Sequence, residues 1–365
     1  MSRLKKIILI GLLLVILGLT GLVLLNDREA DRREQSYNQT ELTELDKSSL
    51  EETLNLKKQL GNQLWPGFAA EEIPLILFND TYEFIHGSEN PGGAWEVVTE
   101  DEIQGKPYYY RSAENPQAFT TPIESGWAAS MTSLEVLNRE VFSMLRQELP
   151  FPINRLLPYQ LVTYGNDFHI TALIHESFHA FQALIARDKF ERSQQVYSQE
   201  RLYPYQNENF KMAWNQEGKL LAAALAAENR TEKLDLIAEF LTNREERRKE
   251  ASLSPAALSY EKNLEWLEGL AKYLEIEFYQ LAADNNQLTE VEFKTEPNYW
   301  DEDNKRLSES LGEHDGHNRF YLSGMAQARL LEQLEVRDWQ EQIMQEDLYL
   351  EDLLKNHLAE RNWKI

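Results

Sequence analysis

The sequence predicts an α+β fold in which a small β-rich subdomain precedes a mostly helical domain. Prolines punctuate residues 65–132, and short β-type runs lie between them. After residue 132, apolar residues recur at helical spacing almost to the end of the chain. An apolar run at residues 7–25 adds one expected transmembrane helix ahead of both parts.

The apolar run is expected to act as an uncleaved signal anchor. It contains 19 residues, close to the ~20 that cross a bilayer as a helix. No small-residue cleavage site follows it. The short tail at residues 1–6 is expected to be cytoplasmic. The predicted location is therefore the cell membrane, with a single pass through residues 7–25 and an extracytoplasmic C-terminal body.

Residues 26–64 are polar and charged and predict a stalk that is helical from about residue 40. The β-rich subdomain at 65–132 is expected to contain strands near 73–78, 95–99 and 107–111, with a last strand within 118–130. The remaining domain, residues 133–365, is expected to be helical. Its predicted helices span 133–148, 168–187, 209–228, 232–250, 256–283, 319–335 and 339–358. The charged run 243–250 predicts a solvated helix face.

Charge and cysteine content exclude several classes of protein. The net charge of −24 argues against a nucleic-acid partner, which requires a basic surface. The chain has no cysteine, so neither disulfides nor thiolate metal ligands are available. The apolar content of 42% is enough to build a substantial core.

The motif H-E-x-x-H, formed by His175, Glu176 and His179, is the strongest functional signal. Histidines four residues apart lie roughly 40° apart around an α-helix, so both can bind one metal ion. Glu176 points about 100° away from His175 and can act as general base toward a metal-bound water. These residue types at this spacing predict a zinc-dependent hydrolase with Zn²⁺ as its cofactor.

The motif helix is apolar around most of its circumference, which predicts that it is buried. Burying histidines and a glutamate without partners would cost several kcal/mol, which a metal and its water would offset. The alternative is a pair of core histidines that are hydrogen-bonded to main chain or carboxylates.

A third ligand must come from outside this helix. Glycine and histidine at positions 182 and 185 would complete a common three-histidine motif, but the chain has Gln182 and Ile185. A second motif is Glu268-Gly269-x-Ala271. With these two motifs the sequence resembles the gluzincin metallopeptidases, in which a second helix brings a glutamate to the zinc.

The resemblance implies a zincin-like catalytic domain, peptide or protein substrates, and Glu268 as the third metal ligand. Ser254-Pro255 is a good helix start, and Glu268 lies at the margin of the apolar face of the helix that follows. Glu217, Glu200 and Glu265 remain alternatives. In such peptidases a strand beside the active-site helix binds the substrate through its edge, and residues 127–131 are the candidate for that strand. The alternative is that residues 127–131 form a strand with a structural role alone.

Tyr321 and His317 are candidates for stabilising the oxyanion of a tetrahedral intermediate. The alternative places His317 at a helix cap and Tyr321 in the core. His86, His169 and His357 are assigned no role. The predicted function is a membrane-anchored, extracytoplasmic zinc metallopeptidase that uses Glu176 as general base. The competing hypothesis is a noncatalytic metal-binding or scaffold protein of the cell surface that retains the same helix pair.

Overall fold

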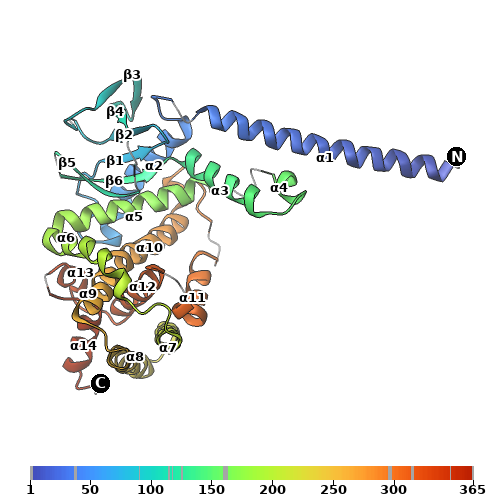
Figure 1. The fold of residues 1–365 in the computed structure, drawn as a ribbon. Helices are drawn as coiled ribbons and strands as arrows, with labels where there is room; N and C mark the ends of the chain where they lie inside the picture. Colours follow the sequence, from blue (N-terminus) through green and yellow to red (C-terminus); the bar gives the residue numbers. More distant parts are fainter. Residues whose placement is uncertain are drawn as a thin grey trace.

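The structure is a computed structural model with an α+β architecture, as expected (Figure 1). A mixed sheet lies over the motif helix, and most of the helices that follow the motif helix in the chain lie on its other side (Figure 1). The structure describes residues 3–36, 39–89, 91–113, 116, 118–124, 126–158, 163–294, 298–313, 316–345 and 347–363.

The sheet contains six strands in the order β3-β4-β2-β1-β6-β5. Their bounds are β1 Leu75–Phe78, β2 Tyr82–His86, β3 Glu96–Ile103, β4 Lys106–Ser112, β5 Phe119–Ile123 and β6 Gly126–Thr132. All neighbours are antiparallel except β1 and β6, which are parallel. The predicted last strand is thus a hairpin, β5–β6, and β2 was not predicted.

The hairpin shows that residues 127–131, the candidate for a substrate-binding edge, do not lie at the edge of the sheet. Strand β6, which contains the predicted residues 127–131, pairs with β1 on one side and with β5 on the other. Both sides of its main chain are therefore occupied. The outer strand next to the motif helix is β5.

The expectation of a transmembrane anchor is wrong. Within the ranges that the structure describes, no helix is both long enough and apolar enough to cross a membrane. The apolar run belongs to a longer helix, α1 (Arg3–Ser36), which continues into a charged segment. Asn26 donates from its side chain to the main-chain carbonyls of Arg155 and Leu157, and Asp27 pairs with Arg146. The predicted single-pass membrane location is corrected by the same finding.

Residues 44–64 form helix α2 (Glu44–Leu64), which is part of the folded body rather than of a free stalk. The Thr43 side chain caps this helix by accepting from the main-chain N–H of Asp46. Leu50, Leu56 and Leu60 are buried in the main core, and α2 packs against the motif helix. Leucines at helical spacing explain why the segment docks despite its polar composition.

The helical part contains most of the predicted helices, but the single helix expected at 339–358 is two helices, 339–342 and 350–360. Ser254 caps the helix that begins at Pro255, as the sequence indicates, and Ser133 caps the first helix. The longer helices are α3 Leu134–Glu148, α5 Asn166–Ile185, α6 Arg187–Gln195, α7 Glu208–Ala226, α8 Arg230–Glu250, α9 Pro255–Leu264, α10 Leu270–Asp284, α11 Asn298–Ser310, α12 Asn318–Gln333 and α14 Leu350–Glu360; short helices span α4 Ile153–Leu156 and α13 Trp339–Gln342.

The charged run of α8 is only partly solvated, because Glu245, Glu246, Lys249 and Glu250 are exposed but its other face is buried. Arg244 and Arg247 are buried, and Arg244 donates to Glu265 at 2.7 and 2.8 Å and to Glu217 at 2.9 Å. Arg247 contacts Glu217 and Glu261. Carboxylates from α7, α9 and the turn that follows α9 therefore neutralise a cluster of arginines in the interior. The sequence pattern of α8 could not reveal these partners, because they lie in other helices.

Candidate metal centre

The motif helix α5 carries His175 and His179 toward the helical layer. His175 is 8% exposed and His179 is 1% exposed, so both imidazoles are buried. The ring centroids of the two histidines are 4.9 Å apart. Leu173, Ile174 and Phe178 are fully buried on the rest of the helix. The near-complete burial that the sequence predicts for this helix is confirmed.

Glu268 lies in a π-helical turn, residues Glu265–Gly269, that joins α9 to α10. Such turns insert one extra residue into a helix and are frequent at functional sites. Gly269 lets this turn touch α12, because a Cβ atom there would lie 2.5 Å from the Cα atom of Gly324. Gly269 of the second sequence motif thus allows the two helices to approach each other closely.

The turn brings Glu268 to the two imidazoles. Its Oε2 atom lies 3.2 Å from Nε2 of His179 and 3.7 Å from Nε2 of His175. One ligand atom from each of these three residues lies within 4.8 Å of the others. The structure therefore groups His175, His179 and Glu268, as the sequence predicted. The alternatives Glu217 and Glu265 are instead bound to Arg244, and Glu200 is not part of the group.

The outer nitrogens of the imidazoles have partners of their own. Nδ1 of His175 lies 2.9 Å from Oε2 of Glu275, and Nδ1 of His179 lies 2.9 Å from Oε1 of Gln182. Both acceptors hold a proton on Nδ1, which leaves each Nε2 free as a ligand. Lys272 pairs with Glu275 at 2.8 Å. Each histidine ring is thus oriented by a hydrogen bond at its Nδ1 atom, away from the Nε2 atom that faces Glu268.

The electrostatic environment favours a cation. Burial lowers the pKa of His175, but hydrogen bonds and charges from Glu268 and Glu275 outweigh it and raise the pKa to about 10. Burial raises the pKa of Glu268, yet His179 and His175 hold it well below its usual range. A positive charge between these groups is therefore stabilised. Oε2 of Glu268 faces the Nε2 atoms of both histidines, which suits three atoms that bind one metal ion.

Glu176 has the environment expected of a general base. Burial raises its pKa above the usual value, and the neighbouring histidines oppose this shift. Its Oε2 atom is buried and has no hydrogen-bond partner. Its main-chain carbonyl accepts from Oγ1 of Thr120 at 3.4 Å, which ties α5 to strand β5. A carboxylate with a free oxygen beside the metal group can take up a proton.

Tyr321 lies beside the metal group and His317 lies further out. The Tyr321 ring stacks on His175 with centroids 6.0 Å apart. Burial and the charge of Glu268, to which Tyr321 is hydrogen-bonded, raise the pKa of Tyr321. His317 occupies the N-cap position of α12 without a capping bond, and its Nδ1 lies 2.9 Å from the Tyr260 hydroxyl. The ring of His317 lies 4.8 Å from the ring of Tyr197, whose hydroxyl donates to Glu268.

Three residues at the site were missed from the sequence. Tyr197 donates from its hydroxyl to Oε1 of Glu268. Gln182 and Glu275 contact the two histidines. Gln182 follows His179 by three residues, so a shared helix face could have indicated it. Glu275 lies two turns after Glu268 on the same helix, but Tyr197 is in a short 3₁₀ segment, Val196–Leu202, that no pattern places at the site.

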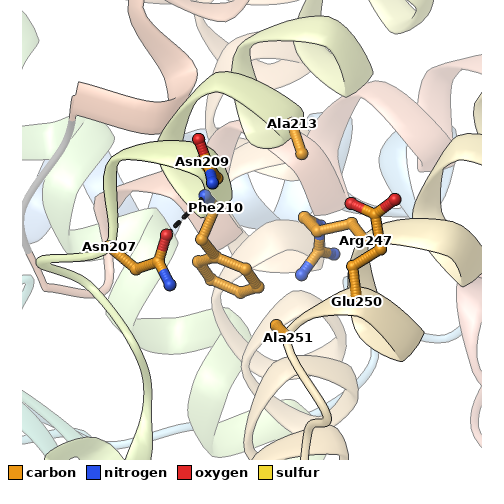
Figure 2. A pocket seen from close by; sticks show the side chains of 7 residues that line it. All are labelled: Asn207, Asn209, Phe210, Ala213, Arg247, Glu250 and Ala251. Carbon is orange, nitrogen blue, oxygen red and sulfur yellow. Dashed lines mark hydrogen bonds between the residues drawn. The ribbon is translucent and has the colours of Figure 1, made fainter.

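A separate small cavity lies between α7 and α8 (Figure 2). It has a volume of about 110 Å³ and is lined by residues that include Phe210, Arg247 and Glu250. Asn207 caps α7 here by accepting from the main-chain N–H of Phe210 (Figure 2). None of the predicted site residues lines this cavity, so we do not assign it to the metal centre.

Comparison of the chain with protein-family models, with curated proteins and with solved structures found no match. The residues of the metal centre are therefore the basis for the function proposed below.

Proposed function

We propose that this protein is a zinc-dependent metallopeptidase. The proposal is carried by one observation: two imidazole nitrogens and a carboxylate oxygen from His175, His179 and Glu268 lie within 4.8 Å of one another in the interior. Two histidines and one glutamate form a common donor set of catalytic zinc sites, which keep a further position open. The unpartnered oxygen of Glu176 beside this set supports catalysis rather than a purely structural metal.

The side chains can divide the work of peptide hydrolysis. Zinc held by the three ligands would polarise the scissile carbonyl and acidify the attacking water. Glu176 takes up the proton of that water and returns it to the leaving amine. Tyr321 donates its hydroxyl hydrogen to the carbonyl oxygen as negative charge develops there. Glu275 and Gln182 hold the two imidazoles in the tautomer that presents Nε2.

The free edge of β5 supports a peptide as substrate. Strand β5 ends the sheet, and among the described strands only β6 pairs with it. The Phe119 ring lies 5.0 Å from the ring of His179, so this edge passes beside the metal group. An extended peptide can add to such an edge through main-chain hydrogen bonds. Strand β5 therefore replaces β6 as the proposed substrate-binding strand.

The proposal is tested by metal removal and return. The purified full chain should hydrolyse a mixture of denatured protein substrates, lose this activity with a chelator, and regain it when Zn²⁺ is added. The products should carry new amino termini. Zinc binding without any hydrolysis would instead support the noncatalytic metal-binding alternative, and absence of zinc binding would refute both readings of the site.

Replacing Glu268 by glutamine should raise the dissociation constant for Zn²⁺ by more than the ~10–100-fold that loss of an outer partner costs. Glu268→Gln removes the only negatively charged ligand of the group, while the side chain keeps its size. Zinc affinity is measured by competition with a coloured chelator. Glu277→Gln on α10, where Glu277 pairs with Arg329, is the matched control and should bind zinc normally. Unchanged affinity in Glu268→Gln would remove this residue from the site.

The two tyrosines should separate by their effects. Tyr321→Phe is expected to lower kcat by about 10²-fold, the loss typical of one oxyanion donor, when kcat is measured with saturating zinc, because the hydrogen bond of Tyr321 to Glu268 is lost as well. Tyr197→Phe removes a hydrogen bond to a ligand and should weaken zinc binding by up to ~10-fold. Steady-state kinetics and zinc titration of both variants check this. Normal kcat in Tyr321→Phe would exclude it from the reaction.

A further inference from the structure

Gln182 joins the two halves of the metal centre. It lies on α5 one turn after His179 and is fully buried. Its Oε1 atom lies 2.9 Å from Nδ1 of His179, and its Nε2 atom donates to the carbonyls of Trp266 and Leu267 at 3.1 and 3.3 Å. Those carbonyls belong to the π-helical turn that carries Glu268. The amide group of Gln182 thus contacts the ligand His179 directly, and it also contacts the turn that carries the ligand Glu268.

The orientation of this amide is fixed by its surroundings. Two carbonyl oxygens can only accept, so the NH₂ end of Gln182 must face Trp266 and Leu267. Its oxygen must then face His179, and an amide oxygen can only accept. The proton of the neutral imidazole is therefore held on Nδ1. Nε2 of His179, which lies 3.2 Å from Glu268, is left with its lone pair.

The π-helical geometry explains why the turn needs an external donor. An extra residue in a helix shifts the main-chain hydrogen bonds and leaves a carbonyl without its usual partner. A buried carbonyl without a partner costs roughly 1–3 kcal/mol. Gln182 supplies two N–H groups at this place. The opposite side of the turn is held by Arg244, which binds Glu265, and by the contact between Gly269 and Gly324.

We infer that Gln182 is a positioning residue that couples the tautomer of His179 to the placement of Glu268 by the π-helical turn. The inference rests on the proposed metal centre. Loss of the amide would remove the control of the His179 tautomer and the support of the turn together, because one rigid group makes both contacts. A merely structural role would affect the stability of the metal-free protein but leave its affinity for metal unchanged.

The experiment measures Zn²⁺ affinity and the visible absorption spectrum with Co²⁺ alone in the full chain. Gln182→Met keeps the length of the side chain and removes both contacts. Its zinc affinity should fall by about 10- to 100-fold, with a changed Co²⁺ spectrum. Gln340→Met is the matched control, since Gln340 donates to the carbonyl of Leu64. This control should bind both metals as the wild type does.

Gln182→Glu keeps an acceptor for His179 and loses the donors to the turn. The zinc affinity of Gln182→Glu should fall at least tenfold. This variant tests the positioning role of Gln182 if Gln182→Met does not fold. In the metal-free wild type, nitrogen NMR should find the proton of neutral His179 on Nδ1. Unchanged affinity in a folded Gln182 variant, or a proton on Nε2, would overturn the inference while the metal centre stands. Absence of zinc binding by the wild type would refute the proposed function itself.

Discussion

Glu176→Gln is expected to lower kcat for peptide hydrolysis by about 10² to 10⁴, the contribution of a positioned general base. Glutamine has nearly the same shape but cannot take up a proton. Glu176 is not among the three grouped ligands, so zinc affinity should stay within a few-fold of the wild type. Steady-state kinetics with a fluorogenic peptide, together with elemental analysis, measures both quantities.

The control for this variant is Glu191→Gln on the exposed face of α6, where Glu191 pairs with Arg187. Its activity should be unchanged. The pH profile adds a second readout, since the Glu176 carboxylate is needed as a base and burial raises its pKa. An acid limb of kcat/KM should therefore be present in the wild type and absent from residual Glu176→Gln activity. Full activity in Glu176→Gln would contradict the assigned role.

Arg244→Met should reduce the free energy of unfolding by about 3–5 kcal/mol, as expected when one partner of a buried ion pair is removed. Arg244 is fully buried and donates to Glu217, Glu265 and Ser323. Without it, Glu265 keeps the hydroxyl of Ser323, which donates to it at 2.5 Å. A nearly uncompensated carboxylate in the interior would carry most of the cost. Urea denaturation followed by circular dichroism measures the change.

The matched control is Arg187→Met, which removes an exposed arginine that pairs with Glu191 four residues later at 2.8 Å. Exposed pairs of this kind contribute little to stability, because solvent screens them. Since Glu265 begins the turn that carries Glu268, zinc affinity should fall in Arg244→Met as well. A loss of stability no larger than that of Arg187→Met would show that the arginine cluster is not a structural centre.

Local patterns carried much of the correct prediction. The cap at Ser254, the apolar periodicity of the motif helix and the spacing of His175 and His179 all act within a few residues. The third ligand could be proposed because the motif Glu268-Gly269-x-Ala271 resembles that of the gluzincins and because Glu268 lies at the margin of an apolar helix face. These features required no knowledge of which helices become neighbours.

The errors arose where the outcome depends on distant partners. The charges of α8 have the spacing of a solvated face, yet Arg244 and Arg247 meet carboxylates from other helices. A single last strand was expected within 118–130, while the structure has a hairpin whose outer strand is β5. The π-helical turn has no sequence signature of its own. Residues 7–25 led to the expectation of a membrane helix, yet no described helix is both long enough and apolar enough to cross a membrane.

The most direct measurement is X-ray absorption spectroscopy of the chelator-free full chain supplied with one equivalent of Zn²⁺. The account predicts one tightly bound zinc per chain, with two imidazole ligands and a carboxylate oxygen, and loss of the imidazole signal in a variant that lacks His175 and His179. A chain that binds no zinc, or one whose zinc persists with the same ligands in that variant, would contradict the account.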